Sequence, residues 1–419
     1  MVNVLFAHPN FPAQFRHLAT ALASSPDNNV YFLTKNERPE WVIPGVTKLV
    51  YQDLPINDPD TKNPYLAPMS DVFNTAFSCF EFCKSWRDKG NNVDLIVGHS
   101  GWGQTIFLKD LFPASKFIGY FEWYFEPLGY SFASMMNDPD VGVQSTYQDV
   151  FRSRISNTAI LHDLALADFG VCATRWQRNQ FPTDFLPKLH VIHEGIDTDY
   201  FAPSDDVRSS GSVALGLGLS PDTKIVTYTS RALEPIRGFP IFMRSASKIL
   251  STNLDVHIVV VADETRVCYG IPRPDGLSYK EYMIRELKEE MDWNRIHFLP
   301  PQDYGNYLQI IQSSDCHVYL TKPYVLSWSF LEVLSCATPL VASSTPPVQE
   351  IVGTDAQYCS QADFWDSQKI ADSVLSILET PLESRERALK GRELVIQRYS
   401  ISDGLQAWND LMKQSLFGA

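Results

Sequence analysis

Short apolar runs recur along the chain, and stretches with helical spacing separate most of them. In the first half these runs are residues 2–7, 30–34, 93–99, 116–121, 169–174 and 188–193. Residues 12–24 show the helical spacing that follows the first run. Because nearly continuous apolar strands are buried on both faces, the pattern predicts a parallel sheet covered by helices.

The pattern pauses at residues 201–223, which are rich in Ser, Asp, Gly and Pro and are typical of a domain linker. It then resumes and predicts a second α/β sheet from residues 224–230, 256–262, 295–300, 315–320 and 339–344. The tail is helical, with breaks near Pro381 and Ser400. Tandem doubly wound sheets bind ligands beyond the carboxyl ends of their strands, so we expect a cleft between two domains.

The length of 419 residues fits two domains of about 150–200 residues each. A net charge of -14 lacks the basic surface that a nucleic-acid partner needs. No run approaches the roughly 20 apolar residues of a membrane span, and the first residues do not resemble a signal peptide. Peripheral membrane contact stays open, as does the oligomeric state. Most of the seven cysteines lie in apolar stretches, which favours a reducing, cytoplasmic location.

Three stretches resemble the motifs of retaining nucleotide-sugar glycosyltransferases of family four. SRALEPIRGF (230–239) is similar to the family's Gly-Arg-Leu…Pro-x-Lys-Gly stretch, and VIHEGIDTDYF (191–201) to its Ile-Pro-Asn-Gly-Val-Asp-x-x-x-Phe segment. FLEVLSCATPLVAS (330–343) is similar to its Leu-Glu-Ala-x-Ala-x-Gly-x-Pro-Val-Val-Ala stretch. The opening FAHPNFPAQFRHLATAL resembles a subgroup whose first loop reads His-x-Asn-Phe-Pro-x-Gln-Phe.

This resemblance implies an α/β GT-B fold, with two Rossmann-like doubly wound domains facing a central cleft. Residues 1–200 would form the acceptor domain, and residues 201–399 would form the nucleotide-sugar donor domain. The last helix, about residues 400–419, would cross back to the first domain.

Arg231 and Arg237 follow the predicted strand at 224–230, before a helix that begins near Gly238. A helix N-terminus with two guanidiniums nearby suits a diphosphate, and fixed positive charge there would stabilise the leaving nucleotide. The alternative is two surface arginines. The family motif has Lys at position 237, and Arg keeps that charge.

Glu332 matches the second Glu of the family's Glu-x7-Glu motif, which holds the ribose hydroxyls of the nucleotide. The first Glu of that motif would stand at position 324, which is Tyr324 here. That tyrosine either meets the transferred sugar or packs. The resemblance implies donor binding by Arg231, Arg237, Glu332, Tyr324, Val325, Leu326, Ser327 and Leu299.

Glu122 ends the predicted strand at 116–121, where the family often has a His near the reacting sugar carbon. Aromatic neighbours would raise the pKa of its carboxyl, which suits proton handling or sugar binding; the alternative is a core Glu paired with Arg. We therefore predict Glu122, Arg231 and Arg237 as catalytic. For the acceptor or the sugar we predict Asn10, Phe11, Gln14, His99, Trp102 and Trp123.

Two Asp-Pro-Asp triplets, at 58–60 and 138–140, are better explained by turn chemistry than by metal binding, so we predict no required metal or other cofactor. The sequence favours a retaining glycosyltransferase that moves a sugar from a UDP- or GDP-linked donor to the hydroxyl of a small-molecule or glycan acceptor. The alternatives are another GT-B enzyme, such as a nucleotide-sugar epimerase or hydrolase, and a non-catalytic nucleotide-sugar-binding protein.

Overall fold

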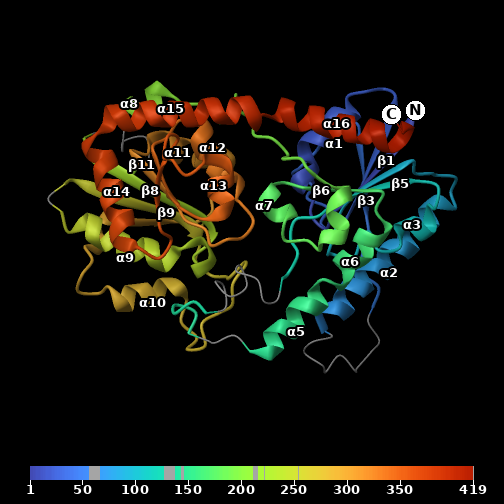
Figure 1. The fold of residues 1–419 in the computed structure, drawn as a ribbon, viewed down its shortest axis with the longest axis horizontal. Coiled ribbons are helices and arrows are strands. Elements are labelled where there is room, and N and C mark those ends of the chain that lie inside the picture. Colours follow the sequence, from blue (N-terminus) through green and yellow to red (C-terminus); the bar gives the residue numbers. More distant parts are fainter. Residues whose placement is uncertain are drawn as a thin grey trace. The chain divides into compact units, whose positions relative to one another are not determined.

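The computed structural model describes residues 1–55, 67–126, 137–142, 146–210, 216–220, 222–252 and 254–418. The chain divides into two compact units, each built around its own sheet (Figure 1). The first unit consists of Met1–Gly129, Thr146–Gly195 and Ile401–Ala419. The second consists of Tyr130–Ser145 and Ile196–Ser400.

The sheet of the first unit has the strand order β3-β2-β1-β4-β5-β6-β7, and its neighbouring strands pair in parallel. The sheet is doubly wound, as predicted from the sequence, and its order reverses between β1 and β4. The strands are β1 (Val2–Ala7), β2 (Asn28–Thr34), β3 (Val46–Val50), β4 (Leu95–His99), β5 (Lys116–Tyr120), β6 (Phe169–Cys172) and β7 (Leu189–Val191).

Successive residues of a strand point to opposite sides of the sheet. Here the residues on both sides are apolar, so a core cluster lies on each face. On β1, Val4 and Phe6 enter one core cluster, whereas Leu5 and Ala7 enter another. The helices of the unit are η1 (Ala13–Phe15), α1 (Arg16–Ala23), α2 (Ala67–Arg87), α3 (Leu108–Leu111), α5 (Tyr147–Ser156), α6 (Thr158–Leu166), α7 (Arg175–Arg178), η2 (Thr183–Lys188) and α16 (Ile401–Phe417). Through Trp408, α16 joins the core cluster of Val4, so the prediction that the last helix returns to the first domain is confirmed.

The sheet of the second unit has the order β10-β9-β8-β11-β12-β13, again with parallel neighbours. The order reverses between β8 and β11. The strands are β8 (Lys224–Ala232), β9 (Val256–Asp263), β10 (Ile296–Leu299), β11 (Cys316–Tyr319), β12 (Leu340–Ser343) and β13 (Ser360–Ala362). Its helices are α8 (Asp205–Ser210), η4 (Pro235–Arg237), α9 (Phe239–Leu250), α10 (Tyr279–Glu286), η5 (Trp293–Arg295), α11 (Tyr304–Ser313), α12 (Trp328–Ser335), α13 (Pro346–Val352), α14 (Ser367–Glu379) and α15 (Pro381–Arg398).

The predicted breaks in the helical tail are confirmed. α14 ends at Glu379, and α15 begins at Pro381, whose missing N–H is tolerated in a first helical turn. α15 ends at Arg398, and α16 begins at Ile401 (red in Figure 1). The segment predicted as a linker contains the short helix α8.

Residues 137–142 group with the second unit although they lie within the first half of the sequence. Asp138 forms a buried ion pair with Lys322, and the carboxylate of Asp140 accepts hydrogen bonds from Arg244. Arg273 donates to the backbone carbonyl of Asp140 at 2.5 Å. These side chains explain why the segment joins a sheet that is built from residues beyond position 200.

The structure describes only one of the two Asp-Pro-Asp triplets. The triplet at 58–60 lies outside the described residues. In the other, the backbone N–H of Asp140 donates to the Asp138 carboxylate at 2.7 Å, which is the turn geometry predicted for it. Within the described ranges, no helix combines the length and the apolar character needed to cross a bilayer.

Candidate active-site residues

Arg237 lies at the carboxyl edge of the second sheet, in the turn between β8 and α9. Its guanidinium Nη1 donates to Thr321 Oγ1 at 2.7 Å and to the Val325 carbonyl at 3.0 Å. Both partners follow β11, the strand at which the order of the sheet reverses. The side chain is thus fixed at the place where doubly wound sheets bind ligands, and a guanidinium carries five N–H donors in all.

Gly238 separates Arg237 from α9, and no other residue type suits this position. Its φ of +72° lies in the left-handed region, where a side chain is strained. A Cβ there would also lie 2.6 Å from the Cβ of Leu320. Glycine therefore allows the turn of Arg237 to approach the residues that follow β11.

Arg231 lies near the end of β8 and is exposed. Its Nη1 donates to the hydroxyl of Tyr269 at 3.2 Å. Tyr269 belongs to the segment after β9, so the neighbouring strands β8 and β9 bring these two side chains together. Arg231 and Arg237, both predicted for the diphosphate, thus lie at the same edge of the second sheet.

Tyr324, Val325, Leu326 and Ser327 form the loop between β11 and α12. The ring of Tyr324 lies 5.8 Å from the ring of Tyr269, centroid to centroid. The carbonyl of Val325 binds Arg237, and Leu326 is buried in the core. The N–H of Ser327 donates to the Tyr319 hydroxyl at 2.9 Å, and its own hydroxyl caps α12. The carbonyl of Ser327 also accepts from the Phe330 N–H at 3.1 Å, so three of the loop's backbone groups are engaged within the protein.

Glu332 lies on α12 with 7% of its surface exposed. Burial raises the pKa of its carboxyl to about 7, and the neighbouring Tyr307 hydroxyl opposes this rise. Glu332 is therefore a buried side chain and not part of an exposed helix face. Leu299, also predicted for the donor, ends β10 and packs partly buried against the small cluster that includes Ile225.

Glu122 follows β5 in the first unit and meets two side chains from other elements. Its Oε2 lies 3.6 Å from His99 Nε2, and its Oε1 accepts from Gln14 Nε2 at 3.3 Å. Its backbone carbonyl accepts from Gln177 at 2.8 Å. The structure thus brings Glu122, His99 and Gln14 together at the carboxyl ends of β1, β4 and β5.

A second histidine borders this cluster. The ring of His8 packs edge-on against His99, with centroids 5.0 Å apart. Burial, and then the charge of His99, hold the pKa of His8 well below its usual range. His8 therefore stays neutral at physiological pH, and its Nδ1 accepts the N–H of Asn10 at 2.9 Å.

The remaining predicted residues of the first unit have different surroundings. Asn10 is exposed and accepts from Asn36 at 2.7 Å, whereas Phe11 is buried and packs edge-on against Phe32. Phe11 thus belongs to the core. Trp123 is 9% exposed, so little of its ring is free for an acceptor.

Trp102 is 52% exposed and lies between two glycines with positive φ. At Gly103 a Cβ would lie 2.2 Å from the carbonyl of Val72, so the turn requires glycine. This turn holds the Trp102 ring out to solvent, with its centroid 6.4 Å from that of His99.

The sequence did not point to Glu234, Thr321 and Tyr269, which contact Arg231, Arg237 or the backbone beside them. Glu234 stands inside the SRALEPIRGF motif, and Tyr269 stands in an insertion with Pro, Gly and Tyr directly after a strand. That insertion was the available signal. Asp163, which accepts from Ser100 at 2.8 Å, likewise escaped notice because it lies on a helix far along the chain.

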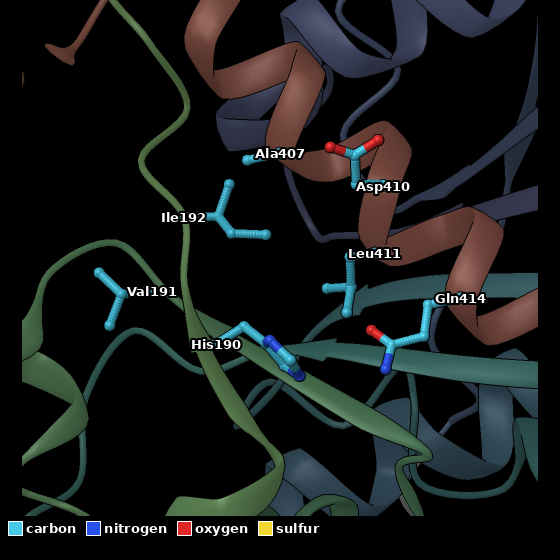
Figure 2. Close-up of a pocket in the computed structure, with 7 residues that line it drawn as sticks. All are labelled: His190, Val191, Ile192, Ala407, Asp410, Leu411 and Gln414. Carbon is cyan, nitrogen blue, oxygen red and sulfur yellow. The ribbon is translucent and has the colours of Figure 1, made fainter. Parts of the chain in front are cut away.

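A hollow of about 410 Å³ lies between β7 and α16. Figure 2 shows the side chains that line it. Its lining side chains come from the end of β7, the residue that follows it, and one face of α16. The lining residues are His190, Val191, Ile192, Ala407, Asp410, Leu411 and Gln414. None of them was predicted for the site.

Comparison with known structures shows the fold. A sucrose-phosphate synthase from Thermosynechococcus elongatus matches with a TM-score of 0.72 and 16% identity, over 100% of both chains. The Anabaena protein HepE, solved in complex with UDP-glucose, matches with a TM-score of 0.69 and 14% identity, over 99% of this chain and 100% of its own.

Sequence comparison gives shorter matches. D-inositol 3-phosphate glycosyltransferase of Mycobacterium leprae (strain Br4923) is 31% identical over 38% of this chain and 33% of its own length. The enzyme of the same name from Mycobacterium sp. (strain JLS) is 26% identical over 45% of this chain and 40% of its own length. The matches to these curated relatives thus span less than half of their length.

Two family models match successive parts of the chain. Residues 26–201 match the glycosyl transferase family 4 group, and residues 218–393 match the glycosyl transferases group 1. The chain thus has the GT-B fold, and its two successive halves match glycosyltransferase family models.

Proposed function

We propose that this protein is a retaining glycosyltransferase that moves a sugar from a nucleoside diphosphate sugar to an acceptor hydroxyl. The observation that carries the proposal is the fixed position of Arg237 between β8 and β11. Arg231 lies at the same edge, and guanidiniums bind diphosphates through charge-assisted hydrogen bonds. The UDP-glucose complex of HepE and the names of the mycobacterial relatives favour the same chemistry.

In this proposal the second unit binds the donor. As the bond between the sugar and the diphosphate breaks, negative charge grows on the leaving group, and Arg231 and Arg237 stabilise it. Glu332 accepts hydrogen bonds from the ribose hydroxyls. Because the two arginines supply positive charge, the proposed transfer runs without a required metal, so we expect full turnover in the presence of a chelator.

The first unit provides the groups for the acceptor or the transferred sugar. Glu122 is held by His99 and Gln14. We favour front-face attack over a covalent intermediate, with the diphosphate taking the proton of the acceptor hydroxyl. The residues His8, Asn10, Phe11 and Gln14 favour the subgroup with the His-x-Asn-Phe-Pro-x-Gln-Phe loop.

The deciding experiment has two steps. First, UDP-, GDP-, ADP- and dTDP-linked sugars are tested for thermal stabilisation, because a ligand at 100 times its Kd adds about 2.7 kcal/mol. Second, the stabilising donor is incubated with a panel of glycan and small-molecule acceptors, and NMR reads the anomeric configuration of the product. Transfer with retention supports the proposal. The absence of any stabilising donor and of turnover would refute it.

A second candidate is a non-catalytic nucleotide-sugar-binding protein. It is favoured by Tyr324, which stands where the family has the Glu that contacts the sugar. The two candidates separate in the same experiment, because such a protein is stabilised by a nucleotide sugar yet gives no product. A hydrolase or an epimerase would instead consume the donor without any acceptor, which a control lacking acceptor detects.

A further inference from the structure

The segment between β9 and α10 reaches the arginines predicted for the diphosphate. It begins after Asp263, at the carboxyl edge of the sheet, and ends at Ser278, which caps α10. Tyr269 lies in its middle, with an intermediate exposure. Neither the sequence motifs nor the comparisons assign Tyr269 a function.

The backbone around Tyr269 is held by a buried carboxylate. Glu234 has no exposed surface and accepts hydrogen bonds from three successive N–H groups. These groups belong to Cys268, Tyr269 and Gly270, at 3.1, 3.0 and 3.0 Å. Bonds to a charged acceptor are among the stronger hydrogen bonds in proteins. Because Glu234 directly precedes the turn of Arg237, the position of Tyr269 is tied to that turn.

The side chain of Tyr269 contacts three of the residues predicted for the donor. Its hydroxyl accepts from Arg231 Nη1 at 3.2 Å. The guanidinium carbon of Arg237 lies 5.5 Å from its ring centroid, within the range of a cation–π interaction. Its ring is tilted by 57° to that of Tyr324, and the centroids are 5.8 Å apart.

We propose that Tyr269 is a further donor-binding residue, a step that rests on the proposed function. Its hydroxyl positions Arg231 for the diphosphate. Its ring, together with that of Tyr324, forms an aromatic wall for the transferred sugar. A hexose presents a face of C–H groups, and aromatic rings bury such apolar surface well.

The aromatic wall also bears on which sugars are accepted. A site that hydrogen-bonds a substrate hydroxyl rejects an analogue that leaves its polar group unpaired by about 10⁴–10⁵-fold, whereas apolar contacts discriminate by only about 10–200-fold. With tyrosine at position 324 instead of a carboxylate, we infer a donor class of hexoses that share an apolar face. Epimers that differ in one hydroxyl should then be used with similar kcat/KM.

The test compares Tyr269→Phe and Tyr269→Leu with wild type by calorimetric titration of UDP and UDP-glucose, or of the corresponding pair for the donor base that stabilises the wild type. Phe removes the bond to Arg231, so both ligands should bind about 3- to 10-fold more weakly. Leu also removes the ring, so the nucleotide sugar should lose about a further 3- to 10-fold, more than UDP loses through the weakened contact with Arg237.

Tyr147→Leu is the matched control, because this tyrosine is 82% exposed on α5 and should leave both affinities unchanged. If Tyr269→Leu does not fold, the Phe variant still tests the contact with Arg231. Wild-type affinity for both ligands in the Phe and Leu variants would overturn the inference while leaving the proposed function intact. A wild type that binds no nucleotide sugar would overturn both.

Discussion

Lys322 and Asp138 form an ion pair in which each side chain is about 1% exposed. Burial lowers the pKa of Lys322, and the charge of Asp138 opposes that shift. The backbone N–H of Lys322 donates to the Ile236 carbonyl at 2.9 Å, next to Arg237. This pair therefore links residues 137–142 to the two loops that carry the predicted donor residues.

Asp138→Asn should destabilise the protein strongly, because it leaves the buried charge of Lys322 without its ion-pair partner. Breaking a buried pair from one side costs about 3–5 kcal/mol. The free energy of unfolding, measured with urea on the full chain, checks this value. The double variant Asp138→Asn with Lys322→Met removes both charges and should recover most of the loss. Equal stability of the single and double variants would contradict the buried pair.

Arg237→Ala should weaken binding of the donor and lower turnover together. It removes charge-assisted hydrogen bonds worth about 1.5–3 kcal/mol each and leaves Thr321 and the Val325 carbonyl without this donor. Arg237→Lys keeps the charge but not the fork, so its affinity should fall between those of the other two proteins. Calorimetry with the nucleoside diphosphate gives the affinities. Arg266→Ala, at an exposed ion pair after β9, is the control and should bind as wild type does.

Glu122→Gln should lower kcat by about 10²-fold or more, the usual contribution of proton transfer by a positioned group. It keeps the size of the side chain and a contact with Gln14 but removes the charge beside His99. Binding of free nucleoside diphosphate should not change, because the predicted diphosphate residues all lie in the second unit. Glu126→Gln, four residues along the chain and exposed, is the matched control. An unchanged kcat in Glu122→Gln would leave Glu122 as a structural residue.

The architecture was predictable because its strands are apolar on both faces. The apolar pattern does not predict β3 and β13, because few of their residues are buried. β3 (Val46–Val50) is mostly only partly buried at the sheet edge, and β13 (Ser360–Ala362) has three residues with a polar start. An edge strand covered on one side leaves too little hydrophobic signal for a periodicity argument.

The sequence predicted which loops carry the candidate site, but it did not predict which of their side chains are in contact. Motifs placed Gln14 and Glu122 at strand ends, and the strand order then brought these side chains together across 108 positions of sequence. Tyr269 and Asp138 could not be predicted in the same way. Their partners, Arg231 and Lys322, are fixed by loop conformations that depend on tertiary packing.

The stability of the protein should depend on pH through Glu332. Its pKa is raised from 4.5 to about 7 by burial, so the folded state favours the protonated carboxyl. The resulting stability is fully present below about pH 4.5 and is lost as the pH rises through 7, amounting to roughly 3 kcal/mol. The side chain of Glu332→Gln cannot ionise. The difference between the Tm of this variant and the Tm of the wild type should therefore shift in favour of the variant as the pH rises from 5 to 8. Parallel Tm curves over this range would contradict the raised pKa.

Glu332→Gln should also separate the nucleotide from the sugar. If Glu332 holds the ribose hydroxyls, the variant loses a charged acceptor that both ligands use, so free nucleoside diphosphate and intact donor should bind more weakly by similar factors, about 10-fold. Tyr324→Phe removes only a hydroxyl. If that hydroxyl meets the sugar, binding of the intact donor or turnover should fall, while free nucleoside diphosphate binds as before. If Tyr324 contributes only its ring, the affinities for both ligands and the turnover should stay unchanged. Calorimetric titration at pH 8, where Glu332 is ionised, measures both ligands. Wild-type affinity for free nucleoside diphosphate in Glu332→Gln would show that this buried carboxyl packs α12 without touching the ribose.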